Sequence, residues 1–156
     1  MKQVMIKMML CMVVAMSGIT AKAQVKAFEK YADTKNVTYV YISKFMLGLA
    51  GKGVAPSVPG VDTKTLAKKL TGIQIITTDN NAAQKKLKSD VKNIVARDKY
   101  ELMMQMNEDD SKVHIYHHIA KPLSAVVMQV DEGDEVTVLV FSGKFTLEDV
   151  MKMAQH

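Results

Sequence analysis

The chain has 156 residues and a mass of 17.3 kDa, with 48% apolar, 24% charged and 6% aromatic residues. This composition is typical of a globular protein and excludes a disordered chain, a collagen-like fibre and a polytopic membrane protein. One domain is expected, large enough to bury a core without disulfides or metals. The formal net charge is +5, but three of the 21 basic residues lie in a segment that we expect to be removed, which leaves +2. A balance this small gives no support to nucleic-acid binding.

The first 23 residues predict a secretory signal peptide. Lys2 and Lys7 begin it, an uncharged run covers residues 8–21, and Ala21-Lys22-Ala23 supplies small residues at the two positions that a signal peptidase reads. We therefore expect cleavage before Gln24, and a protein that is exported to the periplasm or secreted rather than cytoplasmic.

Two alternatives to a cleaved signal peptide are a membrane anchor and a lipoprotein signal. The uncharged run has only fourteen residues, whereas a span needs about 20 apolar residues. Cys11 is preceded by the bulky Leu10, which argues against lipidation. Cleavage removes the only cysteine, so we expect a mature chain, residues 24–156, that forms a single α+β domain without disulfides, thiol chemistry or a transmembrane span.

The first half of the mature chain predicts helices alternating with strands. The segment VTYVYIS is short, β-branched and aromatic, which favours a strand buried on both faces. Residues 44–50 either extend this strand or form a helix. In chain order we expect a helix over residues 24–33, a strand over 37–43, a loop over 51–60, a helix over 62–70 and a strand over 73–78.

Residues 80–97 give the clearest helix prediction. Asp79, Asn80 and Asn81 offer N-caps, and Leu87, Val91 and Ile94 belong to an apolar stripe at helical spacing. The opposite side of this helix carries the basic residues Lys85, Lys88 and Lys92.

The second half predicts four strands in an antiparallel meander, followed by a helix. The apolar period changes to two after Lys99, and the polar segments NEDDS and DEGDE are typical of hairpin turns. Thr146 and Asp149 resemble a capping box that opens a helix reaching about Gln155. The expected strands cover residues 100–106, 112–119, 123–130 and 136–141. The whole order indicates an α+β fold with a mixed, largely antiparallel sheet and helices packed on one face.

Charge is distributed unevenly along the mature chain. Residues 24–99 hold 14 basic and 6 acidic side chains, whereas residues 100–156 hold 4 basic and 10 acidic ones. The helical half is therefore positive, and the turns of the meander are negative.

Several long segments resemble the bacterial domain of unknown function 4252 family. They are FEKYADTKNVTYVYISKFML, TGIQIITTD, YELMMQMNEDDSKVHIY and VLVFSGKFTLEDVMKM, and the resemblance covers residues 28–153. It implies a small exported α+β protein. No activity or ligand follows from it, and no catalytic residue is carried over.

The sequence patterns that could indicate a catalytic or metal site are each incomplete. His114 and His118 would share a strand face about 13 Å apart, with His117 on the other face, so these histidines cannot close a zinc site alone. The acidic turns do not match a calcium loop. Residues 48–53 lack the Ser or Thr that a phosphate loop places after its lysine. Ser89 and Lys92 match S-x-x-K spacing, but the companion motifs of that enzyme class are absent.

The sequence therefore favours an exported, non-catalytic interaction or binding module that needs no cofactor. Its partner would be an envelope protein or an anionic envelope component, engaged through Lys85, Lys88 and Lys92 or through a sheet edge. The alternative is a small envelope hydrolase or metal-dependent enzyme, whose site would assemble from distant residues. For the lysines, the simpler interpretation is that they only keep the helix soluble.

Overall fold

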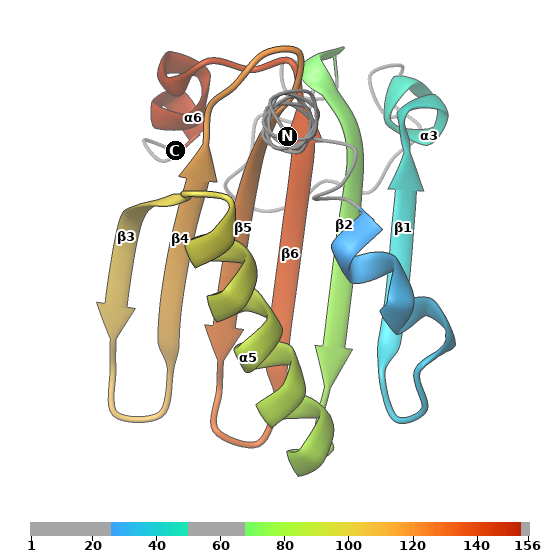
Figure 1. Ribbon diagram of the computed structural model, residues 1–156, viewed down its shortest axis with the longest axis vertical. Coiled ribbons are helices and arrows are strands. Elements are labelled where there is room, and N and C mark those ends of the chain that lie inside the picture. Colours follow the sequence, from blue (N-terminus) through green and yellow to red (C-terminus); the bar gives the residue numbers. More distant parts are fainter. Residues whose placement is uncertain (1–25, 50–67, 154–156) are drawn as a thin grey trace, which may run out of the picture.

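The computed structural model of the protein describes residues 26–49 and 68–153 (Figure 1). The expected signal peptide, the loop over residues 51–60 and most of the helix expected over 62–70 lie outside these ranges. None of the helices in the described ranges is both long and apolar enough to cross a bilayer.

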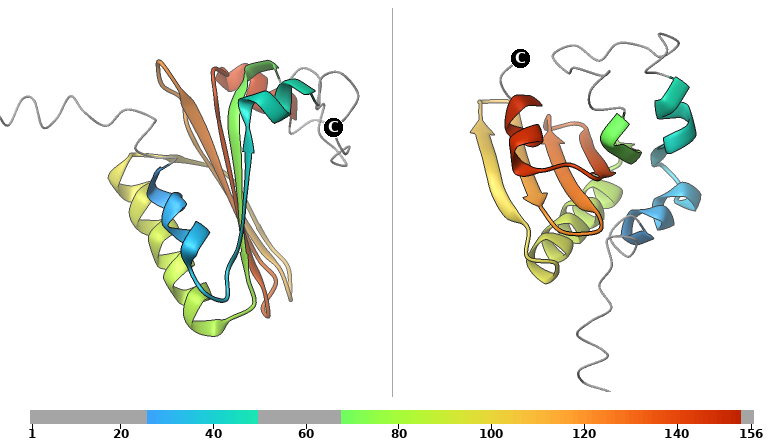
Figure 2. Two further views of the ribbon diagram at one scale, coloured as in Figure 1. Left: turned by 90° about the vertical axis from the view of Figure 1, so that its right-hand side faces the viewer. Right: turned by 90° about the horizontal axis from the view of Figure 1, so that it is seen from above.

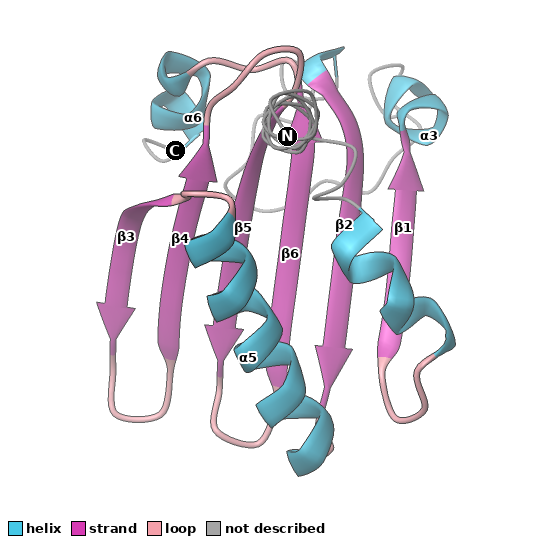
Figure 3. Cartoon of the chain, viewed as in Figure 1, coloured by secondary structure: helices cyan, strands magenta, loops and turns pink. Residues whose placement is uncertain are grey.

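The described residues form one six-stranded sheet in the order β1-β2-β6-β5-β4-β3 (Figures 1 and 3). All five strand pairings are antiparallel. The α+β class and the four-strand meander are confirmed, and the sheet is wholly antiparallel rather than mixed. The strands are β1 (Thr38–Ser43), β2 (Leu70–Thr78), β3 (Glu101–Asn107), β4 (Lys112–His118), β5 (Ser124–Asp131) and β6 (Val136–Gly143).

Strand β1 is an edge strand, so the prediction that residues 37–43 are buried on both faces is wrong. Val40 is 42% exposed and Tyr41 is 52% exposed. Its one partner is β2, and the two central strands of the sheet are β6 and β5. Short β-branched runs occur in both central and edge strands, and only the pairing partner separates the two.

Helices lie on both sides of the sheet (Figure 2). The long helix α5 and the N-terminal helical residues 26–33 pack on one face, whereas the short helices α3 and α6 lie on the other face at one end of the strands. The prediction that the helices pack on one face is therefore correct for α5 and residues 26–33 and wrong for α3 and α6. Residues 44–50, for which a strand extension stayed open, form α3 as far as Leu49. The bounds are η1 (Lys30–Asp33), α3 (Lys44–Leu49), α5 (Asn81–Arg97) and α6 (Leu147–Met153).

Helix α5 follows the sequence pattern closely. The Asn80 side chain accepts a hydrogen bond from the Ala83 N–H, which caps the first turn. Leu87, Val91 and Ile94 are buried against the sheet. These side chains hold α5 in a fixed place over the strands, and its basic side turns away from the core.

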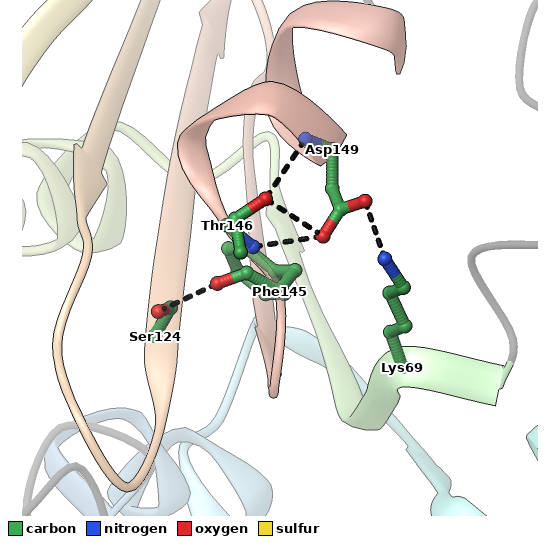
Figure 4. A network of polar contacts seen from close by, with 5 residues as sticks. All are labelled: Lys69, Ser124, Phe145, Thr146 and Asp149. Atoms are coloured by element: carbon green, nitrogen blue, oxygen red, sulfur yellow. Dashed lines mark hydrogen bonds and ion pairs between the residues drawn. The ribbon is translucent and has the colours of Figure 1, made fainter.

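The C-terminal helix begins with the predicted capping box (Figure 4). The Thr146 N–H donates to the Asp149 carboxylate at 2.8 Å, and the Asp149 N–H donates to the Thr146 hydroxyl at 3.3 Å. The same carboxylate binds the Lys69 ammonium. Strand β2 starts directly after Lys69, at Leu70, so the prediction of helix as far as Leu70 is wrong. This contact fastens α6 to the start of β2.

Candidate functional site

A groove of about 540 Å³ lies between α5 and the meander, on the face of the sheet that α5 covers. Helix α5 runs diagonally across the sheet toward β4 and leaves β3 uncovered (Figure 1). The groove lies beside the helix there. Its lining consists of basic, aromatic, apolar and amide side chains, which are Lys88, Val91, Lys92, Val95, Ala96, Lys99, Tyr100, His114, Tyr116 and Gln129.

Two of the three predicted lysines, Lys88 and Lys92, line this groove. Lys85 lies one turn earlier on the same side of α5, because positions three and seven residues apart recur on one helix face. Lys85, Lys92 and Lys99 are exposed. At about 1.5 Å per residue, the lysines from Lys85 to Lys99 extend over about 20 Å. Three lysines, Lys88, Lys92 and Lys99, line the groove itself and give it a basic rim, and Lys85 lies beyond them on the helix.

Lys88 is already engaged within the protein. Its ammonium group lies 2.8 Å from the Asp131 carboxylate at the end of β5. This hydrogen bond lowers the pKa of Asp131. Lys88 therefore joins α5 to the sheet, whereas Lys85, Lys92 and Lys99 are exposed on this side of the helix.

Lys99 stands in an unusual backbone conformation. The Tyr100 N–H donates to the Val95 carbonyl at 3.0 Å, and the Asp98 N–H donates to the Ile94 carbonyl, so α5 ends in a Schellman motif with Lys99 at its left-handed position. The φ of Lys99 is 54°. Glycine normally occupies this position, since a side chain there costs about 1 kcal/mol or more. Lys99 therefore occupies a position at which glycine would make the helix end more stable.

The floor of the groove is aromatic. The His114 and Tyr116 rings on β4 stack with their centroids 6.2 Å apart and their planes 7° apart. Tyr100 is buried and lies 5.4 Å from His118, and this burial raises the pKa of its hydroxyl. The Nδ1 atom of His114 is buried and makes no hydrogen bond within the described residues. The groove thus combines flat apolar surfaces with polar ring atoms below a basic rim.

The polar groups of this lining are amines, an imidazole, phenols and an amide. None of the described residues that line the groove is a serine, threonine, cysteine, aspartate or glutamate. His114 therefore has no carboxylate, aliphatic hydroxyl or thiol beside it in this lining. Across residues 26–49 and 68–153, no group of three or more histidine, cysteine, aspartate or glutamate side chains is placed to hold a metal ion.

The other sequence candidates lie apart from one another. His117 points to the opposite face of β4 from His114 and His118, and its Nε2 lies 3.9 Å from Glu101. The two acidic segments form tight hairpin turns, closed by backbone hydrogen bonds from Glu108 and Glu132. Ser89 is exposed on α5. Of the glycine-rich segment 48–53, only the first two residues are described, and they belong to α3.

A second hollow lies at the opposite end of the sheet, near the start of α5. It is lined by polar residues, but several of them already hold the fold together. The Thr78 hydroxyl donates to the Asn36 carbonyl, and Asn80 caps α5. The groove beside α5 is therefore the better candidate site.

Four lining residues, Lys99, Tyr100, Tyr116 and Gln129, were not identified as site residues from the sequence. The apolar period of two identifies Tyr100, Tyr116 and Gln129 only as positions in the predicted strands of the meander. A basic residue directly after the last turn of a helix, where glycine is usual, is the one signal that points to Lys99.

The protein-family model described as domain of unknown function (DUF4252) matches residues 31–153. A comparison with curated proteins finds no match. Among solved structures, the chain is similar to PA94, a protein of unknown function from Pseudomonas aeruginosa, at 8% identity and a TM-score of 0.36. That similarity covers 79% of this chain and 78% of the other.

Proposed function

Because the chain belongs to the domain of unknown function 4252 family, whose description assigns no activity, we propose a function from the groove itself. The protein is a non-catalytic binding module that holds an anionic ligand between α5 and the meander. The single observation that carries this proposal is the set of lysines that lines the groove above its aromatic floor.

The length of the line of lysines supports an extended ligand. Exposed lysines about 20 Å apart from end to end match an extended chain of about six residues, at 3.3 Å per residue. The tyrosine and histidine rings offer flat surfaces to an apolar or aromatic group of the same ligand. An acidic segment of an envelope protein fits both features.

The place of action is part of the proposal. The basic start, the uncharged run and the small residues before Gln24 support export and removal of residues 1–23. The ligand is then met in the periplasm or outside the cell.

The test is a binding titration with a fluorescent acidic peptide of about eight residues that contains one phenylalanine, long enough to span the lysines. Lys92→Gln should weaken binding about fivefold, since one exposed charge contact is worth up to about 1 kcal/mol. Binding should also weaken as salt is raised, because exposed charges are screened. Lys86→Gln is the matched control, because Lys86 is on the same helix but lies 5.9 Å from the Tyr31 ring.

Lys99→Gly gives a second, sharper test. Glycine suits the left-handed position, so this variant should be more stable by about 1 kcal/mol and should still bind the peptide less well. Greater stability together with weaker binding separates a ligand contact from a structural role. Equal losses in Lys92→Gln and Lys86→Gln would show that only net charge matters, and would refute the groove as the binding site.

A further inference from the structure

The face of the sheet opposite α5 carries an uncharged surface that α3 and α6 cover only at one end (Figure 2). Cross-strand partners on this face align into rows that run over all six strands. The middle row consists entirely of apolar side chains, which are Val40, Ile75, Leu139, Met128, Ile115 and Met104. The next row, away from α3 and α6, holds three threonines, two valines and Met106. We name these two rows the open face.

The open face is accessible at both of its edges. Val40 is 42% exposed, Met104 46% and Met106 37%. By contrast, the row nearest α3 and α6 is packed under Leu47 and Phe145. Soluble monomers rarely leave a continuous apolar patch larger than a few hundred Å² in water.

We propose that a second copy of the chain covers this face, so that the protein is a dimer of two sheets packed face to face. Neither row of the open face contains a charged residue, so the same surface can meet itself without repulsion or buried charge. A two-fold dimer requires such a self-complementary surface. Both grooves beside α5 then face outward and stay accessible.

The area supports a dimer only when the short helices contribute to it. Six strands about 4.8 Å apart and two rows about 6.7 Å apart give an open face of about 400 Å² per copy. That is half of the roughly 800 Å² per partner found in stable interfaces. Phe45 and Met46 on α3, and Leu147 and Met151 on α6, are 45–75% exposed. Four half-exposed large side chains add roughly 300 Å², which brings the total close to the required size.

The position of α3 and α6 selects one orientation. Both helices stand out from this face at the same end of the strands (Figure 2). A two-fold axis parallel to the strands would bring the helices of the two copies against each other and keep the sheets apart. An axis perpendicular to the strands places the helices of each copy against the free end of the other sheet, where their exposed apolar side chains join the interface. In this arrangement β3 lies over β3 of the second copy, and the two Met104 side chains meet.

The test is sedimentation velocity over the micromolar range, on protein expressed from the complete sequence. The wild-type protein should have twice the monomer mass. Met104→Lys and Met104→Glu should each raise the dimer dissociation constant at least about 100-fold, because like charges placed opposite each other are strongly unfavourable. An equal mixture of the two variants should dimerise again. Leu102→Lys is the matched control and should stay dimeric, since Leu102 is 52% exposed on β3 but pairs with Tyr116 on the other face.

Several outcomes would overturn the proposal. A wild-type protein that is monomeric throughout this range excludes the dimer. Unchanged dimerisation of Met104→Lys excludes the open face as its interface. If Met104→Lys pairs with Val40→Glu but not with Met104→Glu, the two-fold axis is parallel to the strands instead. If wild-type monomers bind phosphatidylcholine vesicles and Met104→Lys abolishes this, the face docks on lipid.

Discussion

Replacing Asp149 by asparagine tests the contact that holds α6 to β2. The asparagine side chain has nearly the same shape and can still accept the hydrogen bond from the Thr146 N–H, which measures 2.8 Å in the native protein. It loses the negative charge that binds the Lys69 ammonium. Asp109→Asn, in the exposed turn between β3 and β4, is the matched control.

The size of the effect follows from the pKa of Asp149. The hydrogen bond from Lys69, followed by that from the Thr146 N–H, lowers this pKa from 3.8 to about 2. At about 1.4 kcal/mol for each pKa unit, the fall corresponds to about 2 kcal/mol in favour of the charged form. Lys69 is 40% exposed, so solvent screening reduces the stabilisation to about 1 kcal/mol. The variant should therefore melt about 3–5 °C lower at neutral pH.

The pH dependence has a defined sign. A carboxyl group whose pKa is lower in the folded protein contributes its full stabilisation above its unfolded pKa, near 4, and loses it as the pH falls toward 2. Urea unfolding should therefore show a gap of about 1 kcal/mol between the native protein and Asp149→Asn at neutral pH, and almost none at about pH 2. A gap of the same size at both pH values, or no gap at neutral pH, would refute the charge-based explanation.

Three further outcomes are expected. Leu87→Ala should lower the free energy of unfolding by about 2–5 kcal/mol in urea titrations, because this side chain is fully buried between α5 and the sheet; a loss below about 1 kcal/mol would contradict that packing. A chelator should leave the melting temperature unchanged, and a fall of several degrees would restore a metal role for the histidines or the acidic turns. Mass analysis of the exported protein should find Gln24 as its first residue; a product that retains residues 1–23 or begins with a lipidated Cys11 would contradict the export prediction.

Local patterns predicted the parts of the fold that local interactions determine. The apolar stripe and the Asn80 cap predicted α5, and the capping box at Thr146 predicted the start of α6. The polar turns predicted the meander. These features depend on residues within a few positions of each other, so their signals are readable in one sequence.

Long-range pairing was not predictable in this way. Nothing in the segment 37–43 shows that β1 has only one neighbour, and nothing in β2 shows that it pairs with β6, some 60 residues later. The same distinction between local and long-range signals applies to the residues of the candidate site. Helix periodicity placed Lys88 and Lys92 together, but Tyr116 and Gln129 come to the groove through the pairing of β4 with β5.

The position of β6 has a consequence for how the chain acquires its structure. Strand β6 lies between β2 and β5, although it is the last strand to be synthesised. Until residues 136–143 are available, the β1–β2 pair and the growing meander have no strand to join them, and the core beneath α5 lacks Val136, Val138 and Val140. Such late, distant contacts slow folding. A nascent chain that crosses a membrane with its N-terminus first would therefore stay unfolded, and fit for translocation, until nearly all of it has passed through.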